Sequence, residues 1–117
     1  MKKSNLIKIA LARNIECEYD LQCATAELLD GLGYVWFHTP NEGQRHPAVG
    51  KKLKKAGLKR GVPDVLIFDL KLAIELKYKK GRMTLNQVRW LNDLKWIGWR
   101  AVVCRNMKEV IDNICEE

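Results

Sequence analysis

Apolar positions along the chain follow two different periods, and these periods predict its helices and strands. Between residues 16 and 32 the apolar residues recur at helical spacing. They form one stripe made of Cys17, Leu21, Ala24, Leu28, Leu29 and Leu32. We expect Asn14 to cap this helix and Gly33 to end it. A second helical pattern covers residues 84–97 and ends at Gly98.

Short runs of branched and aromatic residues predict strands at residues 34–38, 61–68, 73–77 and 100–104. Shorter helices are expected at residues 47–56, which begin with a proline, and at residues 106–115, which Asn106 would cap. Residues 1–15 fit a strand, a short helix or a mobile arm. They resemble a signal peptide, but Lys8 and Arg13 interrupt the apolar run and no cleavage site follows. The alternation of helices and strands over 117 residues predicts one α/β domain.

Three charged residues interrupt the otherwise apolar hairpin of segments 61–68 and 73–77: Asp64, Glu75 and Lys77. Glu75 and Lys77 share a face, because side chains alternate along a strand. A turn of two or four residues would pair Leu66 with Glu75 and Asp64 with Lys77, which brings all three charges to one face. A turn of three residues would send Asp64 to the other face.

In the convergent arrangement, Asp64 and Glu75 are diagonal neighbours with Cβ atoms roughly 7–8 Å apart. Two carboxylates at that separation can both reach one divalent cation. The alternative is an internal ion pair, which is costly because desolvation takes several kcal/mol per ion. Such charges are rarely buried unless they are paired.

Two polar residues fall on apolar helix faces. Glu18 lies between Leu21 and Leu29 on a helical wheel, so it is the one carboxylate of its helix directed inward; alternatively it lies in an exposed first turn and complements the helix dipole. Gln87 lies in the middle of a broad apolar face and also completes a capping box with Thr84. That face is formed by Val88, Trp90, Leu91, Leu94 and Ile97. A glutamine directed into a core needs hydrogen-bond partners, which the carboxylates would supply.

The charge balance favours a polyanionic partner. There are 21 Lys and Arg residues against 14 Asp and Glu, and the pI is about 9.4. A run without nearby acidic residues contains Lys51, Lys52, Lys54, Lys55, Lys59 and Arg60. We interpret it as a nucleic-acid-binding surface, with a merely solvated face as the alternative. A second basic segment, after Lys77, contains Lys79, Lys80 and Arg82.

Cysteines and histidines predict no metal site of their own. Cys17, Cys23, Cys104 and Cys115 form no C-x-x-C pair, and His38 and His46 do not complete a zinc pattern. We expect the reduced thiols of a cytoplasmic protein. No apolar stretch is long enough to span a membrane, and no small-molecule cofactor is expected.

Asp64 followed by Glu75-Leu76-Lys77 resembles the Asp…Glu-x-Lys signature of the PD-(D/E)XK nuclease superfamily. Gly-Val-Pro before Asp64 and Gln87 after it resemble the VRR-NUC branch. The stretch from Glu18 to Gln22 is similar to the Glu-x-x-Ile-Gln segment that opens these domains. Residues 38–45 are similar to the His-x-Pro-Asn-Gly-Gly-Lys-Arg loop of stand-alone members, with Glu42 in place of a glycine. The resemblance covers roughly residues 18–105.

The resemblance implies a restriction-endonuclease-like fold, with a mixed central sheet flanked by helices, and a Mg²⁺- or Mn²⁺-dependent endonuclease. Asp64, Glu75 and the main-chain carbonyl of Leu76 would hold the metal. Lys77 would position the attacking water and stabilise the developing charge. Glu18 would complete the outer shell or hold a second ion, and Gln87 would orient one of these groups.

The implied substrate is branched DNA, four-way junctions above all. We count Asn41 and Arg45 of the 38–45 loop among the DNA-binding residues. His38 is either a general base or, in the interpretation we favour, a histidine at a strand end that only forms hydrogen bonds. The first alternative function is a basic nucleic-acid-binding module with a vestigial nuclease site. The second is a protein that binds an acidic partner and no metal.

We also expect a homodimer. Leu85 and Trp96 lie nearly opposite the core face of helix 84–97, and Trp99 and Trp36 add further large apolar groups. Four tryptophans are many for one small core, and aromatic residues are enriched at the centres of interfaces. A two-fold dimer would also supply the two sites that a four-way junction needs. The alternative is that Trp96 lies under residues 1–15.

Overall fold

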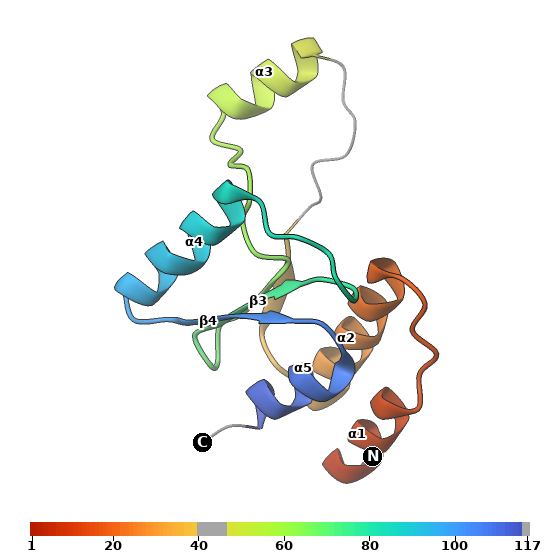
Figure 1. Cartoon of the computed structure of the whole chain (residues 1–117). Coiled ribbons are helices and arrows are strands. Elements are labelled where there is room, and N and C mark those ends of the chain that lie inside the picture. The colour runs from red at the N-terminus through yellow and green to blue at the C-terminus, as the bar shows by residue number, and fades with distance from the viewer. Residues whose placement is uncertain (40–46, 116–117) are drawn as a thin grey trace.

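The computed structural model describes residues 1–39 and 47–115. From residue 16 on, these ranges form helices and strands in the predicted order, and one further helix precedes them (Figure 1). The elements are α1 (Lys3–Leu11), α2 (Glu18–Leu32), β1 (Trp36–His38), α3 (Pro47–Lys55), β2 (Val65–Ile67), β3 (Leu72–Leu76), α4 (Leu85–Trp96), β4 (Arg100–Cys104) and α5 (Met107–Ile114).

The strands form one mixed sheet in the order β1-β2-β3-β4. The pairs β1–β2 and β2–β3 are antiparallel, and the pair β3–β4 is parallel. Helix α4 supplies the crossover that a parallel pair requires. The mixed central sheet is therefore confirmed.

The turn between β2 and β3 consists of residues 68–71, so Leu66 pairs with Ala73. The predicted pairing of Leu66 with Glu75, and of Asp64 with Lys77, is wrong by two residues. Phe68 is a residue type that favours strands, but here it belongs to the turn. Lys71 closes the turn in the left-handed conformation, with φ 47°. An even shift leaves every side chain on its predicted face, so the shared face of the three charges is retained.

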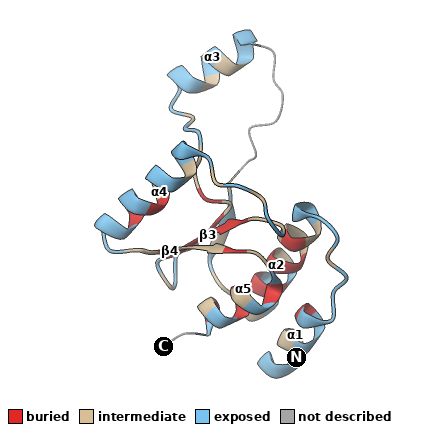
Figure 2. Cartoon of the chain, viewed as in Figure 1, coloured by how far each residue is buried: buried red, intermediate tan, exposed pale blue. Residues whose placement is uncertain are grey.

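Helices cover both faces of the sheet (Figures 1 and 2). Helices α2 and α5 pack on the face that carries Val65, Ile67, Leu72, Ile74 and Leu76, and α1 packs against α2 and α5. Helix α4 packs on the other face, where its Leu91 and Leu94 contact Ala73 and Ala101. Every residue of β3 is buried, because this strand has neighbours on both edges and helices on both faces. Glu75 has the parity of Ala73 and therefore lies on the α4 face.

The start of the chain is a helix, which was one of the three predicted alternatives. Helix α1 buries Ala10 against the core, and Leu6 and Ile7 pack beside it. Helix α2 begins at Glu18 rather than at residue 16. The predicted cap is wrong: Cys17 occupies the N-cap position, and the Asn14 side chain donates to Glu16 instead.

Helix α4 begins with the predicted capping box. The Thr84 side chain accepts from the Gln87 main-chain N–H at 3.2 Å, and Gln87 Oε1 accepts from the Thr84 N–H at 2.8 Å. The predicted core face is too broad, because Val88 and Ile97 are 39% and 69% exposed. Of the strands, α4 packs mainly on β3 and β4, and only Leu91 and Leu94 of the helix are buried.

Helix α3 stands away from the rest of the molecule (Figure 1), and no residue of it is buried (Figure 2). It carries four exposed lysines, called here the α3 lysine patch: Lys51, Lys52, Lys54 and Lys55. Among the described residues no helix is long and apolar enough to cross a membrane. The four cysteines are free thiols, as predicted.

Candidate active site

The β2–β3 hairpin brings together the three charges that interrupt its apolar sequence. Asp64 immediately precedes β2, Glu75 lies inside β3, and Lys77 immediately follows β3. Asp64 Oδ2 accepts a hydrogen bond from the main-chain N–H of Leu76 at 2.7 Å. Lys77 Nζ lies 3.7 Å from Glu75 Oε2. The predicted convergence of these side chains is therefore present.

Glu75 is a buried carboxyl group, 2% exposed in the centre of the sheet. Burial raises its pKa to about 9, and the charge of Asp64 and a side-chain hydrogen bond with Asp64 act in the same direction. Lys77 partly opposes the shift. Two carboxyl groups this close to each other favour a shared proton or a cation between them.

Gln87 connects helix α4 to this pair. Its Oε1 closes the capping box, while its Nε2 donates to Glu75 Oε2 at 3.2 Å. The predicted capping box and the predicted hydrogen bond to a carboxylate are therefore both present, because opposite ends of one amide form the two contacts.

Glu18 lies at the first position of α2 and is exposed there, as the helix-dipole interpretation expects. Its carboxyl group nevertheless faces the cluster. Partial desolvation raises the pKa of Glu18, the charge of Asp64 raises it further, and Lys77 lowers it. Glu18 is therefore at the rim of the site rather than in the interior, close enough to Asp64 and Lys77 to interact with both.

The oxygen donors fit a hard divalent cation. The Asp64 and Glu75 carboxylates, with the adjacent carbonyl of Leu76, are the kind of ligands that Mg²⁺ and Mn²⁺ prefer. The raised pKa of Glu75 also fits a cation site, because a bound cation would offset the burial and the repulsion from Asp64 that keep this group protonated. Among residues 1–39 and 47–115, no group of three or more His, Cys, Asp or Glu side chains is arranged to hold a metal. Main-chain oxygen or water would therefore have to complete the shell.

Basic residues lie on the segments that lead into and out of the hairpin. Lys59 and Arg60 precede it, and Lys79, Lys80 and Arg82 follow it; all five are exposed. The predicted DNA-binding residues Asn41 and Arg45, and also Glu42, lie outside the described residues.

The role of Arg105 was not predicted from the sequence. Its guanidinium donates to the main-chain carbonyls of Lys79 at 2.7 Å and Gly81 at 2.8 Å. It thereby holds the loop that carries the second basic segment. The bonds join residues far apart in the chain, so no local pattern reveals them.

Gly61, in the Gly-Val-Pro-Asp stretch, allows the chain to pass close to the first turn of α4. The chain crosses the first turn of α4 here with φ 81°. A Cβ at this position would lie 2.6 Å from the carbonyl carbon of Asn86 and 2.7 Å from the main-chain nitrogen of Gln87. Only glycine permits so close an approach, and it sets the distance between the segment that ends in Asp64 and the helix that carries Gln87.

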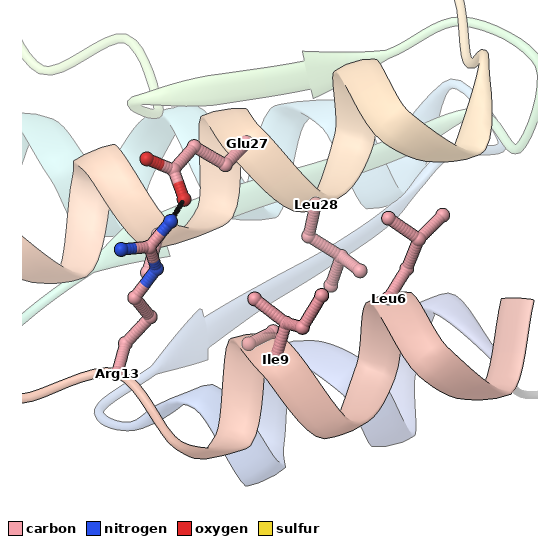
Figure 3. A pocket seen from close by; sticks show the side chains of 7 residues that line it. Leu6, Ile9, Arg13, Glu27 and Leu28 are labelled. Carbon is pink, nitrogen blue, oxygen red and sulfur yellow. Dashed lines mark hydrogen bonds and ion pairs between the residues drawn. The ribbon is translucent and has the colours of Figure 1, made fainter. Parts of the chain in front are cut away.

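A hollow of about 180 Å³ lies elsewhere, between α1 and α2. Leu6, Ile9 and Leu28 form much of its apolar wall, and an ion pair between Arg13 and Glu27 crosses one end (Figure 3). It contains none of the predicted site residues.

The mixed four-stranded sheet, flanked by helices and carrying acidic residues and a lysine on its central hairpin, is a restriction-endonuclease-like α/β fold. Among solved structures, the chain is similar to a protein titled "VRR_NUC domain protein", with a TM-score of 0.56 and 21% sequence identity. The match covers 96% of this chain and 80% of that one. At this identity the likeness shows a VRR-NUC-like fold. No protein-family model and no curated protein matches the chain.

Proposed function

We propose that the protein is a Mg²⁺- or Mn²⁺-dependent endonuclease that hydrolyses phosphodiester bonds of DNA. The observation that carries the proposal is the buried Glu75 carboxyl group, next to Asp64 and 3.7 Å from the Lys77 ammonium. Such a cluster is expensive to bury and is difficult to justify by stability alone. Perturbed carboxyl groups of this kind concentrate at functional sites. The VRR_NUC title of the structural neighbour supports the same class of activity.

The hairpin residues divide the chemistry between them. Asp64, Glu75 and the Leu76 carbonyl would hold the cation. When bound, this ion would polarise the scissile phosphate and make hydroxide available near neutral pH. Lys77 would orient the water that attacks phosphorus and offset the negative charge that develops on the phosphate oxygens. Because Lys77 is only 13% exposed, its charge would act with little screening by solvent.

Two residues from the flanking helices complete the proposed site. The Gln87 amide fixes the orientation of the Glu75 carboxylate through its 3.2 Å hydrogen bond. Glu18, at the rim, would bind a second ion or water of the outer shell.

The substrate we propose is branched DNA, with four-way junctions as the first choice. The α3 lysine patch and the two basic segments beside the hairpin would contact phosphates and supply affinity without sequence readout. We also propose a cytoplasmic location, because four free thiols suit a reducing compartment.

We propose that the working form is a homodimer that uses the outer face of α4. Trp96 is 90% exposed and Leu85 is 66% exposed, so Trp96 does not lie under the N-terminal residues. Trp99 and Trp36 do not extend this surface: Trp99 packs against Phe68 with ring centroids 6.0 Å apart, and Trp36 donates to Asp30.

Sedimentation equilibrium at micromolar concentration tests the dimer. The wild type should have twice the 13.5 kDa mass of one chain, and Trp96→Glu should have the mass of one chain. A wild-type mass near 13.5 kDa would exclude the dimer and weaken the junction proposal.

Cleavage of labelled duplex, single-stranded, flap and four-way-junction DNA in the presence of Mn²⁺ tests the activity. Asp64→Asn and Lys77→Met should each reduce the cleavage rate at least about a hundredfold. Their DNA affinity measured in EDTA should stay at the wild-type value, since neither residue belongs to the phosphate-binding segments. If the wild type binds DNA but cuts none of the substrates in the presence of Mn²⁺, the chain is a binding module with a vestigial site.

A further inference from the structure

We infer that His38 is a positioning residue that fixes Asp64 from the neighbouring strand. His38 is the last residue of β1 and pairs with Val65. Its Nδ1 lies 2.9 Å from the main-chain carbonyl oxygen of Asp64. The same oxygen accepts the main-chain N–H of Thr39, also at 2.9 Å. Two donors from the end of β1 thus converge on one atom of Asp64.

Asp64 needs such an anchor because of its place in the fold. It lies just before the first residue of β2, where pairing with β3 has ended. On the β3 side it is held by its own carboxylate, through the 2.7 Å bond from the Leu76 N–H. On the β1 side it is held by its carbonyl, through His38 and Thr39. The bonds on the two sides together fix both the main chain and the carboxylate of Asp64.

The geometry also assigns the proton on the imidazole. A carbonyl oxygen only accepts hydrogen bonds, so Nδ1 of His38 must be the donor, and Nε2 of the neutral ring must carry the lone pair. This is the hydrogen-bonding role, and it differs from that of a general base, which would act through Nε2.

The inference deepens the proposed function and rests on it for the consequence at the metal. A ligand that is free to rotate binds a cation less tightly than one held in place, and loss of such an outer-shell contact typically lowers metal affinity about 10- to 100-fold. His38 would thus act on metal affinity without touching the metal.

Three substitutions separate positioning from proton transfer. Asparagine places its amide nitrogen where Nδ1 lies, because both atoms are three bonds from Cα, so His38→Asn keeps the donor and removes Nε2. His38→Gln moves the amide nitrogen one carbon further out, and His38→Ala removes the donor altogether.

The first readout is hydrogen exchange of the Leu76 amide in the metal-free protein. His38→Ala and His38→Gln should accelerate it at least about tenfold, because Asp64, whose carboxylate accepts this N–H, loses one of the two donors that hold its carbonyl and keeps only the Thr39 N–H. His38→Asn should restore slow exchange. The Lys77 amide, which donates to the Cys104 carbonyl at 3.1 Å on the β4 side, is the internal control and should not change. Nitrogen-15 NMR of the wild-type imidazole should show the Nδ1–H tautomer.

The second readout is Mn²⁺ affinity by calorimetry. It should fall about 10- to 100-fold in His38→Ala and His38→Gln and recover in His38→Asn. An unchanged Leu76 exchange rate in His38→Ala, or an Nε2–H tautomer in the wild type, would overturn the positioning role. Equal loss of Mn²⁺ affinity in His38→Asn and His38→Ala would also overturn it. If the wild type binds no Mn²⁺, the proposed function fails, while the exchange and tautomer measurements still decide the role of His38.

Discussion

Replacing Glu75 by glutamine should stabilise the metal-free protein, and the gain should grow with pH. Burial and the neighbouring Asp64 raise the pKa of Glu75 from its ordinary value of 4.5 to about 9. Between these values the folded protein keeps a proton that the unfolded chain has already released. The stability that the protonated carboxyl group contributes is therefore complete below the unfolded pKa and is lost as pH rises toward about 9.

The size of the effect follows from the width of the pH range between the unfolded pKa of 4.5 and the folded pKa of about 9. Each pH unit inside it changes the free energy of unfolding by about 1.4 kcal/mol, so the wild type should lose roughly 3 kcal/mol between about pH 5 and about pH 7.5. Glutamine keeps the shape of the protonated side chain and still accepts from the Gln87 amide, but it never ionises. Glu75→Gln should therefore match the wild type near pH 5 and have a Tm roughly 10 °C higher near pH 7.5.

Thermal unfolding followed by circular dichroism in EDTA, over a series of pH values, measures this difference. Asp93→Asn, which removes an exposed carboxylate on α4 away from the cluster, is the matched control and should follow the wild-type curve. Saturating Mn²⁺ should reverse the ranking, because the ion replaces the proton at Glu75 only where a carboxylate is present. Parallel curves of Tm against pH for the wild type and Glu75→Gln would refute the reasoning.

Three further predictions concern the metal, the DNA and the main chain. Mn²⁺ at about a hundredfold above its Kd should stabilise the wild type by about 2.7 kcal/mol. The resulting rise in Tm should vanish in Asp64→Asn. If Asp64→Asn shows the same rise as the wild type, the ion binds elsewhere. Changing the α3 lysine patch to glutamines should weaken binding to all DNA alike and reduce the salt slope by up to about 0.9 per lost phosphate contact, whereas an unchanged slope would show that α3 does not touch phosphate. Gly61→Ala should cost at least about 1–2 kcal/mol in chemical denaturation and also reduce cleavage. Gly57→Ala, at φ 111° with no atom within 4 Å of the added Cβ, should cost only the strain; equal losses would refute the importance of the close approach.

The hairpin and its cluster were predictable because they depend on local rules. Alternation along β3 places Glu75 and Lys77 on one face whatever the partner strand does, and an even turn length keeps Asp64 with them. The capping box at Thr84 and Gln87 is likewise encoded within four residues. The exact register was not predictable, because Phe68 has the intrinsic preference of a strand residue and only tertiary context places it in the turn.

The less predictable features depend on tertiary contacts between segments that are distant in the sequence. Val88 and Ile97 belong to the apolar face that the sequence predicts for this helix, but the fold leaves both exposed. Cys17 occupies the N-cap position without a side-chain cap bond, so Glu18 is the first residue of its helix, and its carboxyl group lies near Asp64 and Lys77. The bonds of Arg105 and His38 to main-chain carbonyls join segments that no sequence pattern connects.

The Gln87 amide couples the stability of the first turn of α4 to the binding of a ligand at Glu75. One end of the amide stops the first turn of α4 from fraying, and the other end holds Glu75. Anything that immobilises Glu75 must therefore also disfavour the open state of that turn. Anything that frays the turn must weaken what Glu75 binds, by the same free energy. A bound cation would thus be detectable on the far side of the hydrogen bond, in the opening equilibrium of a helix turn that it never touches.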